Sequence, residues 1–414
     1  MSDYPHPRGK IVHVADLGRI GARLGDPGGQ GEVLELVDYP TYVLKRYHSG
    51  QAPSLDTITK LTSLFEGLGP ADQAYLDSSS AWPFNPVVDE KDARVLTGIV
   101  IPRIPGCFYE SSPKGRVDLC LEQLLCEDTR MLKIPVSPPS AAQRLQIAIC
   151  YAKYAAFLHQ HHVIIGDINF RNWYWSAPPG GTPKIFAIDV DSYRLVGAPS
   201  SASGLSSPGW EDPLSPKTSC IDSDNYKLGL AVVRMLSRSP WAMPADKALL
   251  RVRSDGGPEL GSLAAELASA QRGLRPIATR WQSSLETAHA AMVNRDRTNA
   301  TKVAHRPPAI RAPRAPSKRP SLTLAPSRSS GTVLAPALKG HASRPTIVVS
   351  PSVASRSAKI APSPSQKRSV RMAHSTLRLW RQAVARGRKV SRRTRIYVGA
   401  AVLVLWVICA IVIH

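Results

Sequence analysis

An acid and an amide lie five residues apart in the stretch HHVIIGDINFRNWYW, residues 161–175. The short apolar run Val163–Ile165 comes directly before Gly166 and Asp167, and Asn172 follows on the same expected loop. This pair suits phosphoryl transfer, because a carboxylate can accept the proton of an attacking hydroxyl while an amide oxygen binds Mg²⁺. Taken singly, Asp167 is better explained as a helix-to-loop cap and Asn172 as a turn residue.

Two further stretches offer side chains for the same chemistry. KIFAIDVDSYRL predicts a strand followed by Asp189 and Asp191, and carboxylates are ligands that Mg²⁺ prefers. Lys45 lies in the strand-like sequence YVLKRY, so a buried stem with an inward ammonium is one interpretation. A solvated lysine on a strand edge is the other, and Arg46 is a competing candidate.

A glycine-rich turn is the third candidate element. GDPGGQGEV places Gly28, Gly29 and Gly31 between two expected strands. Glycines allow backbone N–H groups to approach phosphates closely, but many hairpins use glycines without binding anything. The turn alone therefore does not decide between a phosphate site and a simple hairpin.

The elements that would position these residues follow from the periodicity of the chain. Residues 18–105 predict three strands, a helix over LDTITKLTSLFEGL and two more strands, which gives a small, mostly antiparallel sheet. Residues 106–290 are mainly helical, and SAAQRLQIAICYAKYAAFLHQHH predicts a long helix that begins at the cap residue Ser140. Further helices are predicted for DNYKLGLAVVRMLS and LAAELASAQRGL. The fold class is therefore α+β.

With these stretches in order, the region from Gly18 to Leu285 resembles a eukaryotic-type protein kinase domain, as found in bacterial membrane Ser/Thr kinases. DPGGQGEV is similar to the family's GxGxxGxV loop, with Val33 at its last position and Asp26 in place of the first glycine. Lys45 matches the strand lysine that binds the α- and β-phosphates of ATP.

The remaining family motifs appear in the right order along the chain. Glu66 matches the helix glutamate that pairs with the lysine, and TGIVIPRI, with Ile101 and Arg103, resembles the strand and hinge that meet adenine. Asp167 and Asn172 match the catalytic loop HRDxxxxN, and Asp189 matches the first residue of DFG.

Three motifs after the catalytic loop complete the resemblance. SPGWEDPL is similar to the end of the activation segment, with Glu211 as its glutamate. Asp224 in DNYKLG matches the family's DxxxLG at the start of a long helix. RPIATRWQSSL, which begins at Arg275, matches RPxAxxWxxxL. The last two positions are expected to have structural roles.

The resemblance implies a bilobal fold, with a sheet lobe over residues 18–105 and a helical lobe over residues 106–290. It further implies an ATP-dependent Ser/Thr protein kinase that uses Mg²⁺ or Mn²⁺ and acts on protein substrates. In that case Asp167 positions the nucleophile, Asn172 and Asp189 hold the metal, and Lys45 orients the phosphates. The amides of Gly28, Gly29 and Gly31 would cover those phosphates.

Several departures from the family pattern keep two other functions open. HRD reads IGD, and Asn169 stands where the family has a loop lysine, with Arg171 as the available substitute. DFG reads DVD, so Asp191 is either an extra metal ligand or a repulsive charge. These departures favour a nucleotide-binding pseudokinase scaffold as the alternative. A small-molecule phosphotransferase of related fold is the third reading, since such enzymes also have a GD loop.

The charge of the chain is concentrated at one end. The formal net charge is +22, yet up to Asp296 there are 30 Lys and Arg against 31 Asp and Glu, and after it 23 basic residues and no acidic one. The folded region is therefore almost neutral, and we expect no nucleic-acid partner for it. The six cysteines form no CxxC pair, which predicts reduced thiols without a zinc site.

The carboxyl-terminal region predicts a membrane anchor. Residues 291–377 are rich in Pro, Ser and basic residues and predict a disordered linker, and residues 1–17 are read as an extension. Residues 378–395 form a polybasic segment that would bind anionic lipids. Residues 396–414 are apolar and would form a transmembrane helix of about 28 Å. This arrangement predicts a single-pass protein with its kinase-like domain in the cytoplasm, and it leaves open whether the protein forms a homodimer.

The Ser- and Thr-containing linker is the predicted target of autophosphorylation, because tethering keeps it at a high effective concentration near the kinase-like domain. After incubation with ATP and Mg²⁺, phosphopeptide mapping should find modified residues between positions 291 and 377. An active protein whose linker stays unmodified would contradict this prediction.

Overall fold

A six-stranded sheet forms the amino-terminal part of the molecule, with the strand order β1-β5-β6-β4-β3-β2. All neighbouring strands are antiparallel except β1 and β5, which are parallel. The strands are β1 (Val12–His13), β2 (Ile20–Leu24), β3 (Gly31–Leu36), β4 (Tyr42–Tyr47), β5 (Asn85–Val88) and β6 (Leu96–Pro102).

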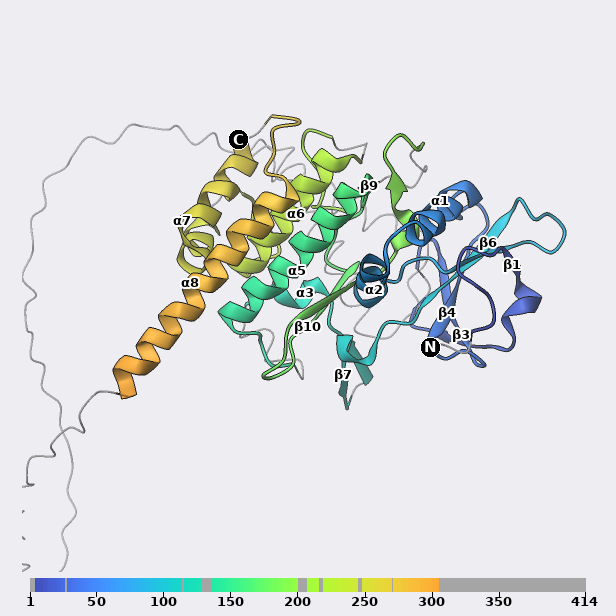
Figure 1. Cartoon of the computed structure of the whole chain (residues 1–414), viewed down its shortest axis with the longest axis horizontal. Coiled ribbons are helices and arrows are strands. Elements are labelled where there is room, and N and C mark those ends of the chain that lie inside the picture. The colour runs from blue at the N-terminus through green and yellow to red at the C-terminus, as the bar shows by residue number, and fades with distance from the viewer. Residues whose placement is uncertain are drawn as a thin grey trace, which may run out of the picture. The chain divides into compact units, whose positions relative to one another are not determined.

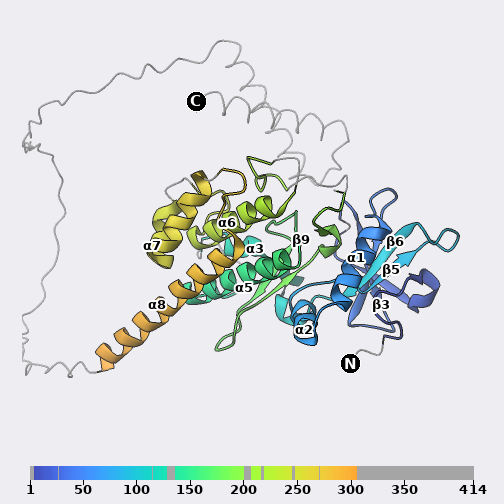
Figure 2. The same ribbon diagram turned by 45° about the horizontal axis from the view of Figure 1, so that its top comes forward.

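The computed structural model describes residues 4–26, 28–113, 115–127, 136–199, 207–215, 219–244, 248–269 and 271–304. These residues belong to one compact unit. We refer to residues 4–105 as the sheet part and to residues 106–304 as the helical part, and the two occupy opposite ends of this unit (Figures 1 and 2). The predicted α+β class, with a small sheet and a set of helices, is confirmed.

Two helices belong to the sheet part and five to the described portion of the helical part. They are α1 (Leu55–Glu66), α2 (Pro70–Ser79), α3 (Leu121–Leu124), α5 (Ala141–Gln160), α6 (Ile221–Ser237), α7 (Ala248–Ser269) and α8 (Ala278–Ala304). Helix α2 was not predicted, and α7 is interrupted at Gly257, which precedes Pro258.

Short elements complete the described chain. The 3₁₀ helices are η1 (Val14–Leu17), η2 (Gly106–Phe108) and η3 (Val190–Ser192). Three two-stranded sheets are formed by β7 (Tyr109–Ser112) with β8 (Gly115–Asp118), β9 (Val163–Ile164) with β12 (Arg194–Leu195), and β10 (Trp173–Ser176) with β11 (Lys184–Ala187).

The long central helix α5 begins where its sequence predicts. The Ser140 hydroxyl accepts a hydrogen bond from the backbone N–H of Gln143, and the Gln143 side chain accepts one from the backbone N–H of Ser140. This capping box satisfies two donors that the first turn leaves without helical partners. The helix packs against α6 and α8, side by side in Figures 1 and 2, and its end delivers the chain to β9.

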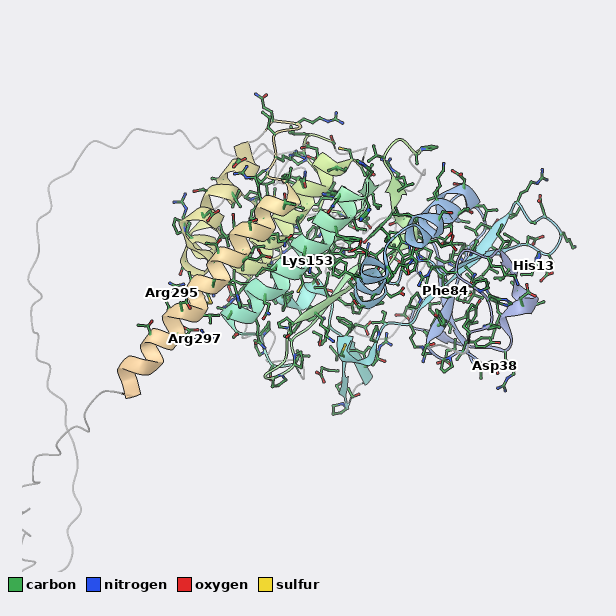
Figure 3. All side chains as sticks on the ribbon, viewed as in Figure 1. His13, Asp38, Phe84, Lys153, Arg295 and Arg297 are labelled. Atoms are coloured by element: carbon green, nitrogen blue, oxygen red, sulfur yellow. The ribbon has the colours of Figure 1, made fainter. Side chains whose placement is uncertain are left out.

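A continuous apolar core joins the sheet part to the helical part. Leu61 and Phe65 of α1 lie in the same buried cluster as Tyr151 of α5 and Trp173 of β10. The indole N–H of Trp82 donates to the backbone oxygen of Leu61, which fixes α1 against this core. Side chains fill the interior of both parts, with Phe84 in the sheet part and Lys153 on α5 (Figure 3).

Two predicted boundaries differ from the observed ones. Residues of the predicted extension 1–17 are part of the fold, because Tyr4, Val12 and Leu17 are buried in one apolar cluster with residues of β3, β4, β5 and β6. The predicted domain end at residue 290 lies inside α8, which continues to Ala304.

The predicted membrane elements cannot be compared with the structure. Among the residues that the structure describes, no helix is both long enough and apolar enough to cross a bilayer. The expected linker beyond Ala304, the polybasic segment 378–395 and the transmembrane helix 396–414 lie outside those residues.

Close packing of α6 against α7 and α8 depends on Gly229. A Cβ atom added there would lie 2.5 Å from Cδ2 of Leu267 and 2.9 Å from the indole carbon Cζ2 of Trp281. Replacing a helical glycine with alanine ordinarily stabilises by about 1 kcal/mol, but overpacking costs about 1–3 kcal/mol. Gly229→Ala should therefore lower the free energy of unfolding in urea.

The exposed Ser63 of α1 provides the control, and Ser63→Ala should change the same free energy by about 0.5 kcal/mol or less. A stabilising effect of Gly229→Ala would contradict the observed packing.

Candidate functional site

A hollow of about 770 Å³, which we call the central hollow, is lined by residues of both the sheet part and the helical part. Its volume suits a small organic ligand. It is lined by Asp26, Gly28, Gly29, Gln30, Gly31, Val33, Lys45, Gly50, Gln51, Ala52, Pro53, Asp167, Asn172, Asp189, Asp191 and Ser192.

The glycine turn between β2 and β3 forms one wall of the central hollow. The backbone N–H of Gly28 donates to the oxygen of Gly31 at 2.9 Å, which closes the turn. A Cβ at Gly31 would overlap with the backbone oxygen of Arg46 on β4, so glycine is required there for strand packing. Nothing lies within 4 Å of a Cβ built at Gly29. Gly31 thus has a structural function, and Gly28 and Gly29 provide an open backbone surface.

Lys45 projects from β4 into the central hollow and is almost fully buried. Its Nζ lies 2.8 Å from Oδ1 of Asp191 and 3.0 Å from Oδ1 of Asp189. The Gln30 side chain accepts a longer hydrogen bond from the same Nζ, at 3.4 Å. Burial lowers the pKa of Lys45, but the carboxylates of Asp191 and Asp189 outweigh this effect and raise it overall. The buried-stem interpretation of Lys45 is therefore confirmed.

Asp189 and Asp191 differ in their surroundings although both contact Lys45. The Asp191 side chain is 3% exposed, and its Oδ2 accepts a hydrogen bond of 2.7 Å from the Tyr47 hydroxyl. Burial, and after it Asp191, raises the pKa of Tyr47, so this hydroxyl keeps its proton. The Asp189 side chain is 43% exposed, and its backbone adopts the left-handed conformation with φ of 56°.

Asp167 and Asn172 lie together on the loop that follows β9. The Asn172 amide donates to Oδ2 of Asp167 at 3.2 Å, and the Asn169 amide donates to the same oxygen at 2.8 Å. The backbone oxygen of Asn172 accepts a hydrogen bond from the backbone N–H of Ile188, which holds the loop beside the segment that carries Asp189. Asn172 lines the central hollow, and its side-chain oxygen has no hydrogen-bond donor among the described residues.

Ser207 is a contact of Asp167 that the sequence analysis missed. Its hydroxyl lies 3.2 Å from Oδ1 and 3.4 Å from Oδ2 of Asp167, and its backbone N–H donates to Oδ1 at 3.3 Å. The two residues are 40 positions apart, so no local pattern could have paired them. Tyr47, by contrast, could have been found, because it is two residues after Lys45 on one strand and so shares its face.

Helix α6 holds the loop that carries Asp167 in place through two polar side chains. The fully buried carboxylate of Asp224 accepts hydrogen bonds from the backbone N–H groups of Ile165 and Gly166. Lys227, one turn later, donates to the backbone oxygen of Gly166. Burial lowers the pKa of Lys227, and Asp224 partly offsets this. Asp224 therefore has the structural position that the sequence predicts.

A buried ion pair joins two segments of the helical part, at Asp212 and Arg275. Arg275 donates two hydrogen bonds to the carboxylate of Asp212, and both side chains are buried. Glu211, which the sequence analysis matched to the glutamate at the end of the activation segment, is not the partner of Arg275. Glu211 is exposed and accepts a hydrogen bond from the backbone N–H of Gly209. Asp212, next in the sequence, points to the opposite side and reaches Arg275.

Two other predicted site residues, Glu66 and Arg171, lie away from the cluster. Glu66 does not pair with Lys45: it is exposed at the end of α1, and its carboxylate lies against Gly9. Arg171 is exposed and does not line the central hollow, so it does not replace a loop lysine there. The place expected for that lysine is taken by the amide of Asn169, which bonds to Asp167.

The predicted adenine-binding pair does not line the central hollow either. Ile101 packs in apolar clusters near Phe108 and Ile99. Arg103 forms an ion pair of 2.7 Å with Glu35 on β3, which holds its guanidinium close to the sheet.

The charges of the central hollow favour a cation accompanied by an anionic ligand. Its lining has four carboxylates and one ammonium, a formal balance of −3. Within the described chain, no group of three His, Cys, Asp or Glu side chains converges to hold a metal alone. A Mg²⁺ ion that uses one or two protein oxygens and completes its shell with phosphates and water fits this arrangement, through Asp189 and Asn172.

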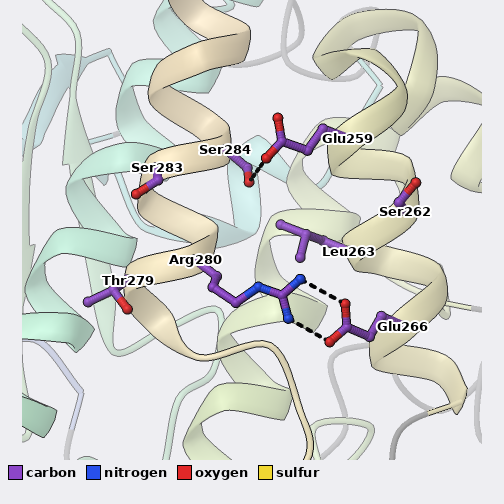
Figure 4. Close-up of a pocket in the computed structure, with 8 residues that line it drawn as sticks. All are labelled: Glu259, Ser262, Leu263, Glu266, Thr279, Arg280, Ser283 and Ser284. Carbon is purple, nitrogen blue, oxygen red and sulfur yellow. Dashed lines mark hydrogen bonds and ion pairs between the residues drawn. The ribbon is translucent and has the colours of Figure 1, made fainter.

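A second hollow, of about 290 Å³, lies between α7 and α8 and is shown in Figure 4. Arg280 forms two hydrogen bonds with Glu266, and the Ser284 hydroxyl donates to Glu259 at 2.6 Å. These polar groups satisfy one another across the seam between the helices. The arrangement is explained by helix packing and needs no ligand.

Comparison with known proteins gives no relative: no protein-family model and no curated protein matches the chain. Any inference about function therefore rests on the geometry of the central hollow.

The buried pair of Asp212 and Arg275 gives a prediction on stability. Asp212→Ala should lower the free energy of unfolding by about 3–5 kcal/mol, because it leaves a guanidinium buried without its partner. Glu211→Ala should cost about 1 kcal/mol at most, since it removes one exposed hydrogen bond. Urea denaturation followed by circular dichroism measures both, and equal losses would show that the assignment of Asp212 is incorrect.

Proposed function

We propose that this protein is an ATP-dependent phosphotransferase of the protein-kinase type, which transfers the γ-phosphate to hydroxyl groups of proteins. One observation carries the proposal: Lys45, Asp167, Asn172 and Asp189, which are distant in sequence, line a single hollow. Their chemical types are those that phosphoryl transfer requires, namely a phosphate-binding cation, a proton acceptor and two oxygen ligands for Mg²⁺.

Each residue has a role that its surroundings support. The ammonium of Lys45 is held by the carboxylates of Asp189 and Asp191, which follow β11, so that it can orient phosphates. Asp167 is held by amide donors, and it can accept the proton of an acceptor hydroxyl. Asn172 and Asp189 would hold Mg²⁺ or Mn²⁺, which would neutralise charge on the triphosphate.

The acceptor side of the hollow also has a feature that suits a hydroxyl substrate. The Ser207 hydroxyl lies within hydrogen-bond distance of both oxygens of Asp167. This contact supports the proposal, because a general base must lie within hydrogen-bond distance of the hydroxyl that it deprotonates.

A nucleotide-binding pseudokinase scaffold is the second candidate. In its favour, Asp167 accepts hydrogen bonds from Asn169, Asn172 and Ser207, so its carboxylate oxygens are already engaged. A small-molecule phosphotransferase has no specific observation in its favour. Membrane attachment through residues 396–414 and binding of anionic lipids through residues 378–395 remain predictions from the sequence.

Transfer of radiolabelled phosphate from ATP to a mixture of protein substrates tests the proposal. Asp167→Asn should lower the rate by about 10²–10⁴-fold, because the proton acceptor is removed. Lys45→Met should lower it to a similar background. Glu66→Gln serves as the control. It should leave the rate within about twofold, since that carboxylate is exposed and forms no ion pair with Lys45.

Equal background transfer by the wild type and by Asp167→Asn would exclude the kinase. Saturable binding of Mg²⁺-ATP without transfer, measured by thermal shift, would then support the scaffold. An inert thermal-shift profile would exclude both.

A further inference from the structure

Asp191 stands at a position where the resembled family has glycine, and its surroundings give it a specific function. Its side chain is 3% exposed, and both carboxylate oxygens have partners. Oδ1 lies 2.8 Å from Nζ of Lys45, and Oδ2 accepts a 2.7 Å hydrogen bond from the Tyr47 hydroxyl. The carboxylate thus contacts two side chains of β4 at once.

We propose that Asp191, held by Tyr47, is the residue that positions Lys45 for the phosphates, and that Asp189 is the metal ligand of the two. The inference rests on the proposed function, because it names the roles of two acids within the same site. It excludes both roles that the sequence alone allowed for Asp191, an extra metal ligand and a repulsive charge.

The first argument is accessibility. A hard cation such as Mg²⁺ needs an oxygen that can also face water and phosphate. Asp191 cannot provide one while its oxygens bond to Lys45 and Tyr47 in a buried environment. The Asp189 side chain is 43% exposed, and only its Oδ1 is engaged by Lys45. Asp189 therefore keeps an oxygen that faces the hollow.

The second argument is that no carboxylate of α1 takes this place. The two acids of that helix are Asp56 and Glu66. Asp56 forms an ion pair of 2.7 Å with Lys60, and the exposed Glu66 lies against Gly9. The ammonium of Lys45 is consequently fixed by a segment of the helical part and not by α1. No carboxylate of α1 contributes to its orientation.

The third argument concerns charge. A buried ammonium is costly unless it is paired and hydrogen-bonded. Asp191 is as deeply buried as Lys45 and so provides the close partner that this cost demands. The negative charge of Asp189 is then left for a cation. Tyr47 adds a fixed donor to Asp191, since strand positions two apart present side chains to one face.

Nucleotide binding can separate the two roles. Calorimetry on the full chain would use a nonhydrolysable ATP analogue over a series of Mg²⁺ concentrations. Asp191→Asn and Tyr47→Phe should each weaken binding of the analogue by about tenfold and leave the half-saturating Mg²⁺ concentration within about twofold. Asp189→Asn should raise the half-saturating Mg²⁺ concentration by about tenfold or more.

Two outcomes would overturn the inference in this assay. Asp191→Asn could raise the Mg²⁺ requirement as strongly as Asp189→Asn, which would make Asp191 a metal ligand. Asp191→Asn could instead leave the affinity for the analogue and the half-saturating Mg²⁺ concentration unchanged, which would show that Asp191 does not position Lys45. Failure of the wild type to bind the analogue would defeat the proposed function, whereas normal binding by the wild type and by Asp191→Asn alike would defeat the inference alone.

Urea unfolding tests the pairing of Lys45 with Asp191 without any nucleotide. Lys45→Met should lower the midpoint, because it leaves the Asp191 carboxylate buried without its cation. Adding Asp191→Asn to Lys45→Met should raise the midpoint again. Adding Asp189→Asn, the matched control, should change it little, since that side chain is half-exposed. Equal midpoints for Lys45→Met and its combination with Asp191→Asn would contradict the pairing.

Discussion

The buried ammonium of Lys45 is the constraint on which the arrangement of the central hollow depends. A charge in this position is tolerated only if opposite charges and hydrogen bonds surround it. Its partners Asp189 and Asp191 belong to the segment after β11, whereas Lys45 belongs to β4. The pairing therefore ties the sheet to the helical part at the point where the hollow forms. The hydrogen bond from the Tyr47 hydroxyl to Asp191 adds a second polar link between the same two segments.

A second set of buried polar contacts keeps the opposite wall rigid. Helix α6 presents Asp224 and Lys227 to the backbone around Gly166, so the loop that carries Asp167 rests on a helix. Arg275 and Asp212 form a further buried pair beside it. Because unsatisfied buried polar groups are costly, these contacts allow few other loop conformations. Asp167 and Asn172 thus line the hollow from a loop that is hydrogen-bonded to α6.

Two residues at which the sequence departs from the kinase motifs, Asn169 and Asp191, have clear hydrogen-bond partners in the structure. Asn169 occupies the place of a loop lysine and donates to Asp167 with a neutral amide. Asp191 occupies the place of a glycine and supplies the carboxylate that α1 does not provide. Both side chains supply hydrogen bonds or ion pairs to residues that line the central hollow. The four carboxylates and one ammonium of the hollow make a bound cation more favourable.

Sequence periodicity alone determined the strands around the glycine turn, the long helix α5 and the acid–amide loop at its end. These are local features, set by alternation of apolar residues, by the cap at Ser140 and by glycine conformation. The order of the polar residues along the chain also indicated the four that line one hollow. The sequence did not indicate which residues these side chains contact. The choice of Asp212 over Glu211, the failure of Glu66 to reach Lys45 and the contact of Ser207 with Asp167 were decided by the tertiary structure. Which face a side chain presents, and which distant segment packs against it, depends on the packing of whole elements, and a spacing along the chain does not contain that information.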